Sequence, residues 1–477
     1  ERIRERGINP YPNSYRRTHT VLEAKELYQN GQMAEDSFVS LAGRIVAQRG
    51  MGKATFLDLR DGSGKIQSYF RRDELGDKKY ELLHELDIGD FIGVTGSLFS
   101  TKTGEITVKV SDFAILAKSL EPLPEKWHGL VDVEKRYRQR YLDLISNESA
   151  RETFLIRSKI IAAIRRFLDS RGFIEVETPV LQHVAGGARA HPFSTHHNTL
   201  DQDLYLRIAT ELYLKRLIVG GFDKVYEIGR IFRNEGISTK HNPEFTTLEC
   251  YEAYADYNDV MNLVEEMVAE VAREVLGTCV TGYGEHTIDF TPPWKRVTLR
   301  EVIHEQCGID LEKTLSNDED NLRCTVERLG IGLDETWSPA YLIDKLVSTF
   351  VEPEIIQPTF LIDYPVETTP LAKTKPGDES LVERFEAFVA GMEIANAFTE
   401  LNDPVEQAKR FDVQEKWRLQ FGDQEAERYQ DDFIMALKHG MPPTGGLGVG
   451  IDRLVMLLTG QQSIRQVILF PQLKEKD

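Results

Sequence analysis

The sequence contains little cysteine and no long apolar run. Only four of its 477 residues are cysteines, and they lie far apart with no C-x-x-C pair among them. This spacing argues against a disulfide scaffold and a zinc knuckle, and it fits a reducing compartment. No run approaches the roughly 18 apolar residues that a membrane-spanning helix needs. We therefore expect a cytoplasmic protein with no membrane segment.

Basic residues are also in the minority. Lys and Arg number 58 against 77 Asp and Glu, which gives a net charge of −19. This balance excludes a uniformly basic protein that coats nucleic acid, but it is compatible with a local basic face. The length predicts two or three domains. The chain starts at Glu1 without Met or an apolar signal core, so we expect that preceding residues are missing.

The common nucleotide-binding loops are absent as well. Gly52-Lys53 and Gly64-Lys65 look like the end of a phosphate-binding loop, but neither pair is followed by Ser or Thr. No G-x-G-x-x-G segment follows a strand-like run, so a dinucleotide-binding fold is unsupported. Any nucleotide chemistry must therefore use another kind of site.

The first third of the chain predicts a small β-barrel. Residues 1–36 form a charged lead with a helix near Val21–Asn30. Residues 37–117 contain five short β-rich runs, with a helix-like stretch at Lys79–Leu86 after the third: Ser37–Val46, Ala54–Leu59, Lys65–Phe70, Asp90–Leu98 and Glu105–Leu116. This order is typical of an OB-type barrel, which often binds single-stranded nucleic acid. A generic β-module is the alternative, since a fold does not imply a function.

The remainder predicts a linker followed by one large α/β region. Residues 118–150 contain Pro122 and Pro124 and then a charged helix. Residues 151–477 begin with an amphipathic helix, Phe154–Gly172, and a strand, Phe173–Leu181. Residues 305–350 look like a helical insertion. Further elements are a helix at Asp259–Gly277 and strands at Phe360–Tyr364, Glu383–Ala390, Glu393–Thr399 and Gly446–Gly450.

A long hairpin is predicted from Arg230 to Tyr251, with unusually polar strands. Arg233 could bind a phosphate with two donors, and Phe245 could lie flat under a purine. A surface hairpin with salt bridges and one core Phe would give the same pattern.

A glycine-rich strand, Gly445–Gly450, is followed by an apolar helix. Arg453 falls in the first turn of that helix, where the helix dipole favours anions over cations. An arginine placed there suggests an anionic ligand nearby. A packed strand beside a surface arginine is the alternative.

The third polar stretch runs from Glu383 to Asp403. Glu386 and Glu393 could hold a divalent cation if the chain turns at Gly391. Asn396, Phe398 and Glu400 alternate, so they share one face of a strand. A buried carboxylate is costly unless it is paired, and a cationic ligand could be the partner. A solvent-facing strand edge is the alternative.

These segments together resemble a family. Arg233 with Phe245, and the G-x-G-x-G-I-D-R segment ending at Arg453, resemble motifs 2 and 3 of class II aminoacyl-tRNA synthetases. Phe154–Leu181 looks like motif 1, which forms the dimer in that class. The resemblance implies an α/β (α+β) architecture, in which a catalytic domain built on an antiparallel sheet flanked by helices follows the barrel. It also implies a homodimer.

An N-terminal OB barrel is similar to that of the subgroup for aspartate, asparagine and lysine. Within it, Thr210–Leu217, Arg233–Phe245 and Gly391–Asp403 look like lysyl-tRNA synthetases, which implies ATP, L-lysine and tRNA(Lys) as substrates. Glu211, Glu249 and Glu400 make the pocket acidic, as a lysine ammonium requires. We expect no internal Arg or Lys to neutralise them.

The resemblance also implies residue roles. For lysine, Glu400 and Tyr251 would hold the ε-ammonium group. Glu211 and the Gly186-Gly187 backbone would hold the α-amino group, and Asn396 and Arg233 would hold the carboxylate. Glu249 and Phe398 would complete the pocket.

For ATP, the implied contacts are Arg233 on the α-phosphate, Phe245 on adenine, Glu235 at the adenine edge, and His241 and Arg453 near the γ-phosphate. Glu386 and Glu393 would bind Mg²⁺, and the implied anticodon readers are Arg49, Phe56, Gln67 and Glu105. Ala395 and Ala397 depart from relatives with glycines beside the Asn, and they would narrow the backbone approach slightly.

Three other functions are compatible with parts of the pattern. An aspartate or asparagine synthetase would need cations in the pocket, and the three carboxylates argue against it. A non-catalytic regulator would be favoured by loss of Arg233, Arg453 or Glu393, and all three are present. A paralogue that transfers lysine to a protein resembles the catalytic domain alone, so the barrel disfavours it.

Overall fold

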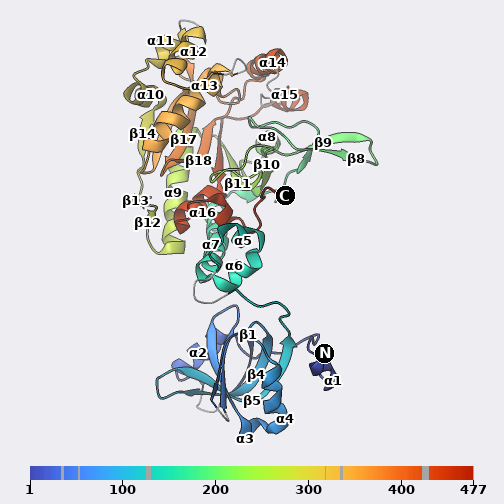
Figure 1. Cartoon of the computed structure of the whole chain (residues 1–477). Helices are drawn as coiled ribbons and strands as arrows, with labels where there is room; N and C mark the ends of the chain where they lie inside the picture. Colours follow the sequence, from blue (N-terminus) through green and yellow to red (C-terminus); the bar gives the residue numbers. More distant parts are fainter. Residues whose placement is uncertain are drawn as a thin grey trace. The chain divides into compact units, whose positions relative to one another are not determined.

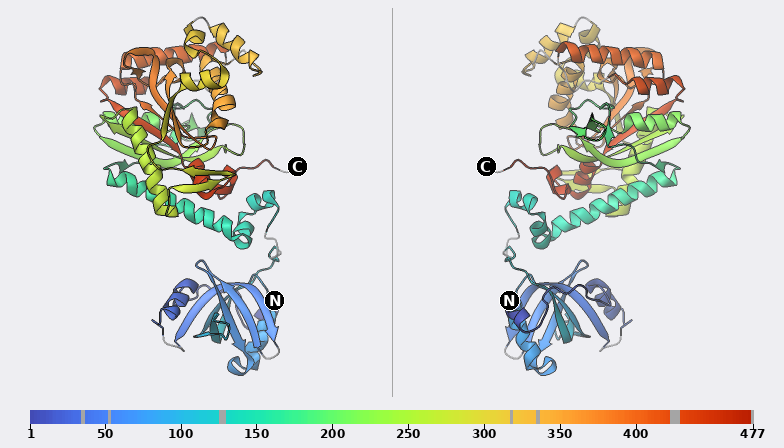
Figure 2. Two further views of the ribbon diagram at one scale, coloured as in Figure 1. Left: turned by 90° about the vertical axis from the view of Figure 1, so that its left-hand side faces the viewer. Right: turned by 90° about the vertical axis from the view of Figure 1, so that its right-hand side faces the viewer.

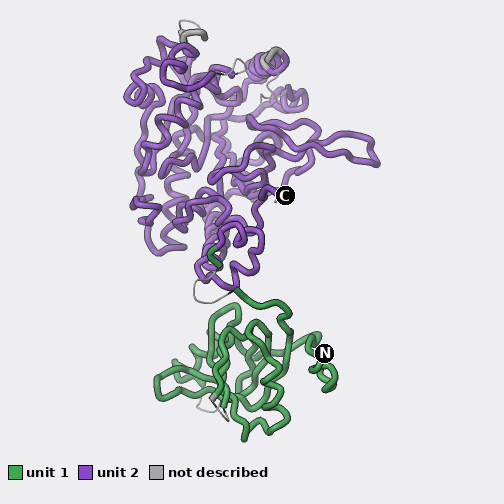
Figure 3. Tube along the Cα trace, viewed as in Figure 1, with its two compact units in different colours: residues 1–131 green, residues 132–477 purple. Residues whose placement is uncertain are grey.

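The computed structural model describes residues 1–477 except 34–36, 52–53, 125–129, 317–318, 334–336, 422–428 and 476–477. The chain divides into two compact units, Glu1–Val131 and Asp132–Asp477 (Figure 3). The division falls inside the segment 118–150 that we expected as a linker, of which residues 125–129 lie outside the described part. None of the described helices combines the length and apolar character needed to cross a membrane.

The first unit is a closed five-stranded barrel with strand order β1-β2-β3-β5-β4 (Figure 1). Its strands are β1 (Phe38–Met51), β2 (Ala54–Arg60), β3 (Lys65–Arg71), β4 (Phe91–Ser100) and β5 (Ile106–Ala117). The helices α3 (Arg72–Leu75) and α4 (Asp77–Leu82) separate β3 from β4, so the predicted helix after the third strand is confirmed. Alternate residues of these strands fill the barrel core.

In the described part of the segment before β1, the chain forms two helices. The first, α1, spans Arg2–Glu5. The second, α2 (Val21–Gln29), confirms the predicted helix, and Thr20 and Glu23 form a capping box at its start.

The second unit is built on a large mixed sheet with strand order β14-β15-β17-β18-β19-β11-β10-β6 (Figures 1 and 2). Its middle pairs are antiparallel, while β14 with β15 and β10 with β6 are parallel. The bounds are β6 (Ile174–Glu175), β10 (Lys224–Phe232), β11 (Glu244–Ala253), β14 (Lys295–Thr298), β15 (Thr359–Pro365), β17 (Asp378–Val389), β18 (Met392–Thr399) and β19 (Thr444–Gly450), with β16 (Thr374–Lys375) beside β17.

One face of this sheet is the hydrophobic core. Leu248 and Cys250 of β11, and Leu447 and Val449 of β19, belong to one buried cluster. The helices α7 (Glu148–Ser170), α9 (Tyr257–Leu276) and α16 (Ile451–Thr459) supply the other side of that cluster. Because side chains alternate along a strand, the intervening residues must point to the opposite face. Those residues include most of the predicted site.

Other elements surround the sheet. A three-stranded sheet contains β7 (Leu181–Gln182), β8 (Ser194–His197) and β9 (Gln202–Leu206), and its β8–β9 hairpin projects from the unit in Figure 1. The sheet strands are accompanied by α5 (Val133–Arg138), α6 (Arg140–Ser146), α8 (Glu211–Val219), α10 (Leu299–Cys307), α11 (Leu311–Ser316), α12 (Glu319–Arg328), α13 (Pro339–Leu346), α14 (Pro404–Phe421), α15 (Asp431–Lys438), α17 (Ile464–Val467) and the hairpin β12 (Val280–Tyr283) with β13 (His286–Asp289).

The predicted strand at Phe173–Leu181 is wrong over most of its length. Only Ile174–Glu175 pairs with β10 in the main sheet. Further along, the backbone N–H and the hydroxyl of Thr178 donate to the Glu227 carboxylate, at 3.0 and 2.7 Å. Pro179 has no N–H to donate to a ladder. The segment is therefore extended but only partly paired. The Val176 N–H donates to the Tyr226 carbonyl of β10 and the Val180 carbonyl accepts from the Arg207 N–H, both at 2.9 Å, while Thr178 between them bonds to a side chain.

Candidate active site

The polar face of the sheet brings together residues that are far apart in sequence. Glu386 of β17 lies opposite Asn396 of β18, Asn396 opposite Gly448 of β19, and Gly448 opposite Glu249 of β11. In the next row Gly446 lies between Phe398 and Tyr251. The predicted site residues of β17, β18 and β11 are thus brought together on one part of the sheet.

Glycine is required at the centre of this arrangement. A Cβ atom on Gly446 would lie 1.8 Å from Glu400 Oε1 and 2.6 Å from Tyr251 Cε1. Both contacts are shorter than any side chain tolerates, so Gly446 leaves the space that these two groups occupy. Gly187, in a left-handed conformation with φ +86°, lies against Glu211 in a similar way, with 3.1 Å from its ideal Cβ to the Glu211 Cβ.

The acidic cluster contains an internal cation, contrary to our expectation. Lys215 is fully buried and forms ion pairs with Glu211, four residues earlier in α8, and with Glu400. Its Nζ also lies 5.3 Å from the centre of the Phe398 ring. Charge alone therefore no longer identifies the ligand of this cluster. Three carboxylates against one ammonium still leave two negative charges when all of them are ionised.

Two acceptors of the cluster do not depend on Lys215. Glu249 Oε1 accepts from the Thr210 backbone N–H at 3.0 Å, and Tyr251 donates to Glu249 Oε2 at 3.4 Å. Glu400 is 1% exposed, and its Oε1 has no hydrogen-bond partner among the described residues. A buried acceptor without a donor is costly, so this oxygen is suited to a ligand that donates.

Burial dominates the titration of these groups. Desolvation raises the pKa of Glu249 to about 7. It also raises the pKa of Glu211 and Glu400, and Lys215 only partly offsets the effect. Burial by itself would lower the pKa of Lys215, but the two carboxylates outweigh it and raise that pKa. The paired ammonium therefore stays charged at neutral pH.

The predicted phosphate and adenine residues lie around the β10–β11 hairpin. Arg233 directly follows β10, and its guanidinium carbon lies 5.3 Å from the centre of the Phe245 ring, with both residues partly exposed. Arg453 donates to the Glu393 carbonyl at 2.6 Å and lies 3.2 Å from His241 Nε2. Desolvation of the His241 ring and the nearby Arg453 lower the pKa of His241 to about 4, so this ring is neutral at pH 7. Glu235 is exposed in the hairpin loop.

A buried network joins the three motif segments, and it was missed in the sequence. Asp452 accepts from the Thr246 backbone N–H at 2.7 Å and pairs with Arg157 at 2.5 Å. Arg157 also donates to the Thr246 hydroxyl at 3.1 Å. The network therefore ties α7, β11 and α16 together beside Phe245 and Arg453.

The two predicted metal ligands lie on adjacent strands. The β17–β18 hairpin turns at Ala390 and Gly391, whose φ values of 50° and 68° are both left-handed, as the prediction required. Glu393 interacts electrostatically with Glu386, and desolvation is the main reason that the pKa of Glu386 is raised to about 7. Two carboxylates on adjacent strands fit Mg²⁺, which usually takes one or two carboxylates together with phosphate oxygens. The described residues contain no cluster of three or more possible metal ligands.

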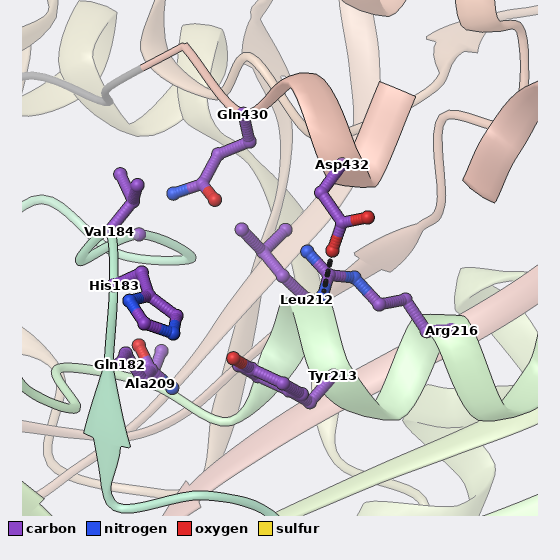
Figure 4. A pocket seen from close by; sticks show the side chains of 10 residues that line it. Gln182, His183, Val184, Ala209, Leu212, Tyr213, Arg216, Gln430 and Asp432 are labelled. Carbon is purple, nitrogen blue, oxygen red and sulfur yellow. Dashed lines mark ion pairs between the residues drawn. The ribbon is translucent and has the colours of Figure 1, made fainter. Parts of the chain in front are cut away.

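A cavity of about 280 Å³ opens beside Gly186 (Figure 4). Tyr213 and Arg216 of α8 line it, and Arg216 pairs with Asp432 at 2.7 Å. Sequence reasoning missed both residues of α8, although their spacing of three places them on one helix face.

The barrel residues predicted to read the anticodon lie on one patch. Phe56 is half-buried and stacks on Tyr69 with a centroid distance of 4.7 Å, so it is not barrel core. Gln67 is buried and donates to Glu105 at 3.2 Å, so it is not a plain surface residue. Arg49 pairs with Asp58 at 3.1 Å. The neighbouring Tyr69 was missed, although it alternates with Gln67 along β3.

Comparison with known proteins places this geometry in a family. Residues 132–474 match the family model described as tRNA synthetases class II (D, K and N), and residues 39–116 match the OB-fold nucleic acid binding domain. The chain therefore belongs to the class II tRNA synthetases of the D, K and N group.

Full-length relatives narrow the family further. A lysine–tRNA ligase of Dehalococcoides mccartyi is 57% identical over 480 residues, which cover 100% of this chain and 96% of that protein. Those of Pelotomaculum thermopropionicum and Carboxydothermus hydrogenoformans are 56% and 55% identical, over 100% of this chain and 93% and 96% of theirs. Within the group, the chain belongs to the lysine–tRNA ligase family.

Proposed function

We propose that the protein is a lysine–tRNA ligase. It activates L-lysine with ATP to lysyl-adenylate and pyrophosphate, and then esterifies the 3′-terminal adenosine of tRNA(Lys). The observation that carries the proposal is the buried cluster of Glu249, Glu400 and Tyr251, which lies on the same sheet face as Phe245. Family membership and the full length of the match support it.

The acceptors of the pocket are compatible with lysine. When Glu211, Glu249 and Glu400 are all ionised, two negative charges remain after Lys215 is counted, and lysine brings two ammonium groups. The free Oε1 of Glu400 accepts from the ε-ammonium, with Tyr251 beside it. Glu211 and the Gly186-Gly187 backbone receive the α-ammonium. The α-carboxylate then lies toward Asn396 and Arg233.

The first step needs no general base on the protein. The lysine carboxylate attacks the α-phosphorus of ATP in line, and the reaction depends mostly on positioning and charge stabilisation. Arg233 stabilises the charge that develops on the α-phosphate, and Phe245 stacks on the adenine. Arg453, with the neutral ring of His241 beside it, contacts the γ-phosphate side. Mg²⁺, held by Glu386 and Glu393, would neutralise charge on the phosphates.

Three further features belong to the proposal. Leu155, Ile174, Val180 and Leu181 are exposed in the segment 154–181, which supports a homodimer through that segment. Phe56, with Arg49, Gln67 and Glu105, supports anticodon recognition by stacking and base-edge hydrogen bonds. A cytoplasmic location is consistent with the family and with four cysteines that are all free.

A pyrophosphate-exchange screen over the twenty amino acids tests the activation step. We expect exchange that depends on lysine. Exchange with aspartate or asparagine and not with lysine would show that the pocket belongs to another member of the group. Absence of exchange with every amino acid would point to a non-catalytic protein. Charging of a tRNA(Lys) transcript tests the second step separately.

A further inference from the structure

One buried arginine links the amino-acid side of the candidate site to its metal side. Arg384 lies two residues before Glu386 in β17, so both point to the same face of the strand. It is 8% exposed, and each of its three guanidinium nitrogens donates a hydrogen bond. Nε donates to Asn396 Oδ1 at 3.1 Å, Nη1 to Thr369 Oγ1 at 2.6 Å, and Nη2 to Glu386 Oε1. The Tyr364 ring covers the guanidinium, with 4.4 Å from Cζ to the ring centre.

The contact with Arg384 fixes which way the Asn396 amide points. An arginine has no acceptor, so the atom of Asn396 that it meets must be the oxygen. The Nδ2 group then points away from Arg384, and it has no hydrogen-bond partner among the described residues. Asn396 therefore presents two N–H donors, which suit an anionic group such as a carboxylate.

The same arginine fixes the Glu386 carboxylate. Oε1 accepts from Arg384, while Oε2 accepts from the Tyr364 hydroxyl at 2.7 Å. The side chain is 13% exposed, so little freedom remains. Each carboxylate oxygen has two lone pairs, and these protein contacts leave one on each oxygen for a metal ion.

We propose that Arg384 is a positioning residue for the activation step. It turns the Asn396 amide toward the α-carboxylate of lysine, and it holds Glu386 toward the metal and phosphates. In-line attack needs the carboxylate and the α-phosphorus placed together, and one rigid side chain supports both. This inference rests on the proposed function, but it concerns a residue that touches neither substrate.

Two binding measurements test it on the full-length protein. Isothermal titration measures the affinity for L-lysine without metal or ATP. Electron paramagnetic resonance measures the Mn²⁺ midpoint in the presence of ATP. We expect Arg384→Met to weaken lysine binding and to raise the Mn²⁺ midpoint, each at least tenfold. In pyrophosphate exchange the lysine KM should rise similarly.

Asn396→Asp separates the two sides of the site. The aspartate keeps an oxygen for Arg384 but loses the Nδ2 donors, so lysine binding should weaken while the Mn²⁺ midpoint stays within twofold. Arg384→Lys keeps the charge but cannot reach three acceptors from one nitrogen. Like Arg384→Met, the Arg384→Lys variant should weaken lysine binding and raise the Mn²⁺ midpoint. It replaces Arg384→Met as the test if that variant fails to fold.

Arg140→Met is the matched control for the loss of a buried guanidinium. Arg140 is 1% exposed in α6, where it pairs with Asp143 and donates to the Leu469 carbonyl at 2.8 Å. Both affinities should stay within twofold in this variant. The inference is wrong if the lysine affinity and the Mn²⁺ midpoint also stay within twofold in Arg384→Met or Arg384→Lys. It is wrong as well if only one of these two quantities changes in those variants. Failure of the unmodified protein to bind lysine would instead overturn the proposed function.

Discussion

Replacing Glu249 by glutamine should stabilise the second unit at alkaline pH while it weakens lysine binding. Glu249 is 8% exposed, and its partners are the Thr210 N–H and the Tyr251 hydroxyl. A glutamine has the same shape, and its oxygen can still accept from Thr210. The substitution therefore removes a buried negative charge without opening a cavity.

The magnitude follows from the shift in the pKa of Glu249. Its ordinary value of 4.5 rises to about 7 in the folded protein because of burial. A carboxyl group whose pKa is higher in the folded than in the unfolded protein lowers the free energy of unfolding once the pH exceeds its pKa in the unfolded protein. This loss reaches its full size when the pH exceeds its pKa in the folded protein. At 1.36 kcal/mol per pKa unit, the stabilisation by Glu249→Gln should be about 3 kcal/mol at pH 8 and about 1 kcal/mol at pH 5.

Urea unfolding at pH 8, 7 and 5 measures this difference. Tryptophan fluorescence suits the assay, because three of the four tryptophans (Trp294, Trp337 and Trp417) belong to the second unit. The lysine KM in pyrophosphate exchange should rise, because the substitution removes a negative charge from the cluster that receives the lysine ammonium groups in the proposed function. A loss of stability at pH 8, or a gain that is the same at all three pH values, would refute the reasoning.

Three further predictions concern other parts of the chain. Lys215→Met should cost about 3–5 kcal/mol of unfolding free energy in urea, because Glu211 and Glu400 lose their buried partner; an unchanged midpoint would mean that the pair contributes nothing. Arg233→Ala should lower kcat/KM for pyrophosphate exchange by about 10²–10³-fold, the cost of removing one transition-state donor, and near-normal exchange would remove Arg233 from its role. Phe56→Ala should weaken tRNA(Lys) binding by about 1–3 kcal/mol, since stacking of a base is its expected contact. The charging assay should show this loss while pyrophosphate exchange stays unchanged; equal loss in both assays would contradict an anticodon role.

Local patterns in the sequence identified the elements whose burial is regular. The strands of the barrel are β-rich runs broken by glycines, so all five were predicted, although β1 runs on to Met51. The glycine-rich strand was predicted from its glycines, and the helix after it from the apolar run that starts at Leu454. The segment 173–181 looked like a strand because its residues alternate. It failed because pairing depends on a neighbour, and Thr178 bonds to the Glu227 side chain there.

The sequence by itself determined the family, the barrel and the positions where polar residues interrupt apolar strands, because all of these depend on short-range order along the chain. Only the tertiary structure decided that Lys215 sits between Glu211 and Glu400, and that Arg384 holds both Asn396 and Glu386. Their spacing of four along α8 and of two along β17 was visible, but the other partners come from distant segments. The charge of a buried site depends on every group that the fold brings within a few ångströms, and sequence separation carries no record of those distances.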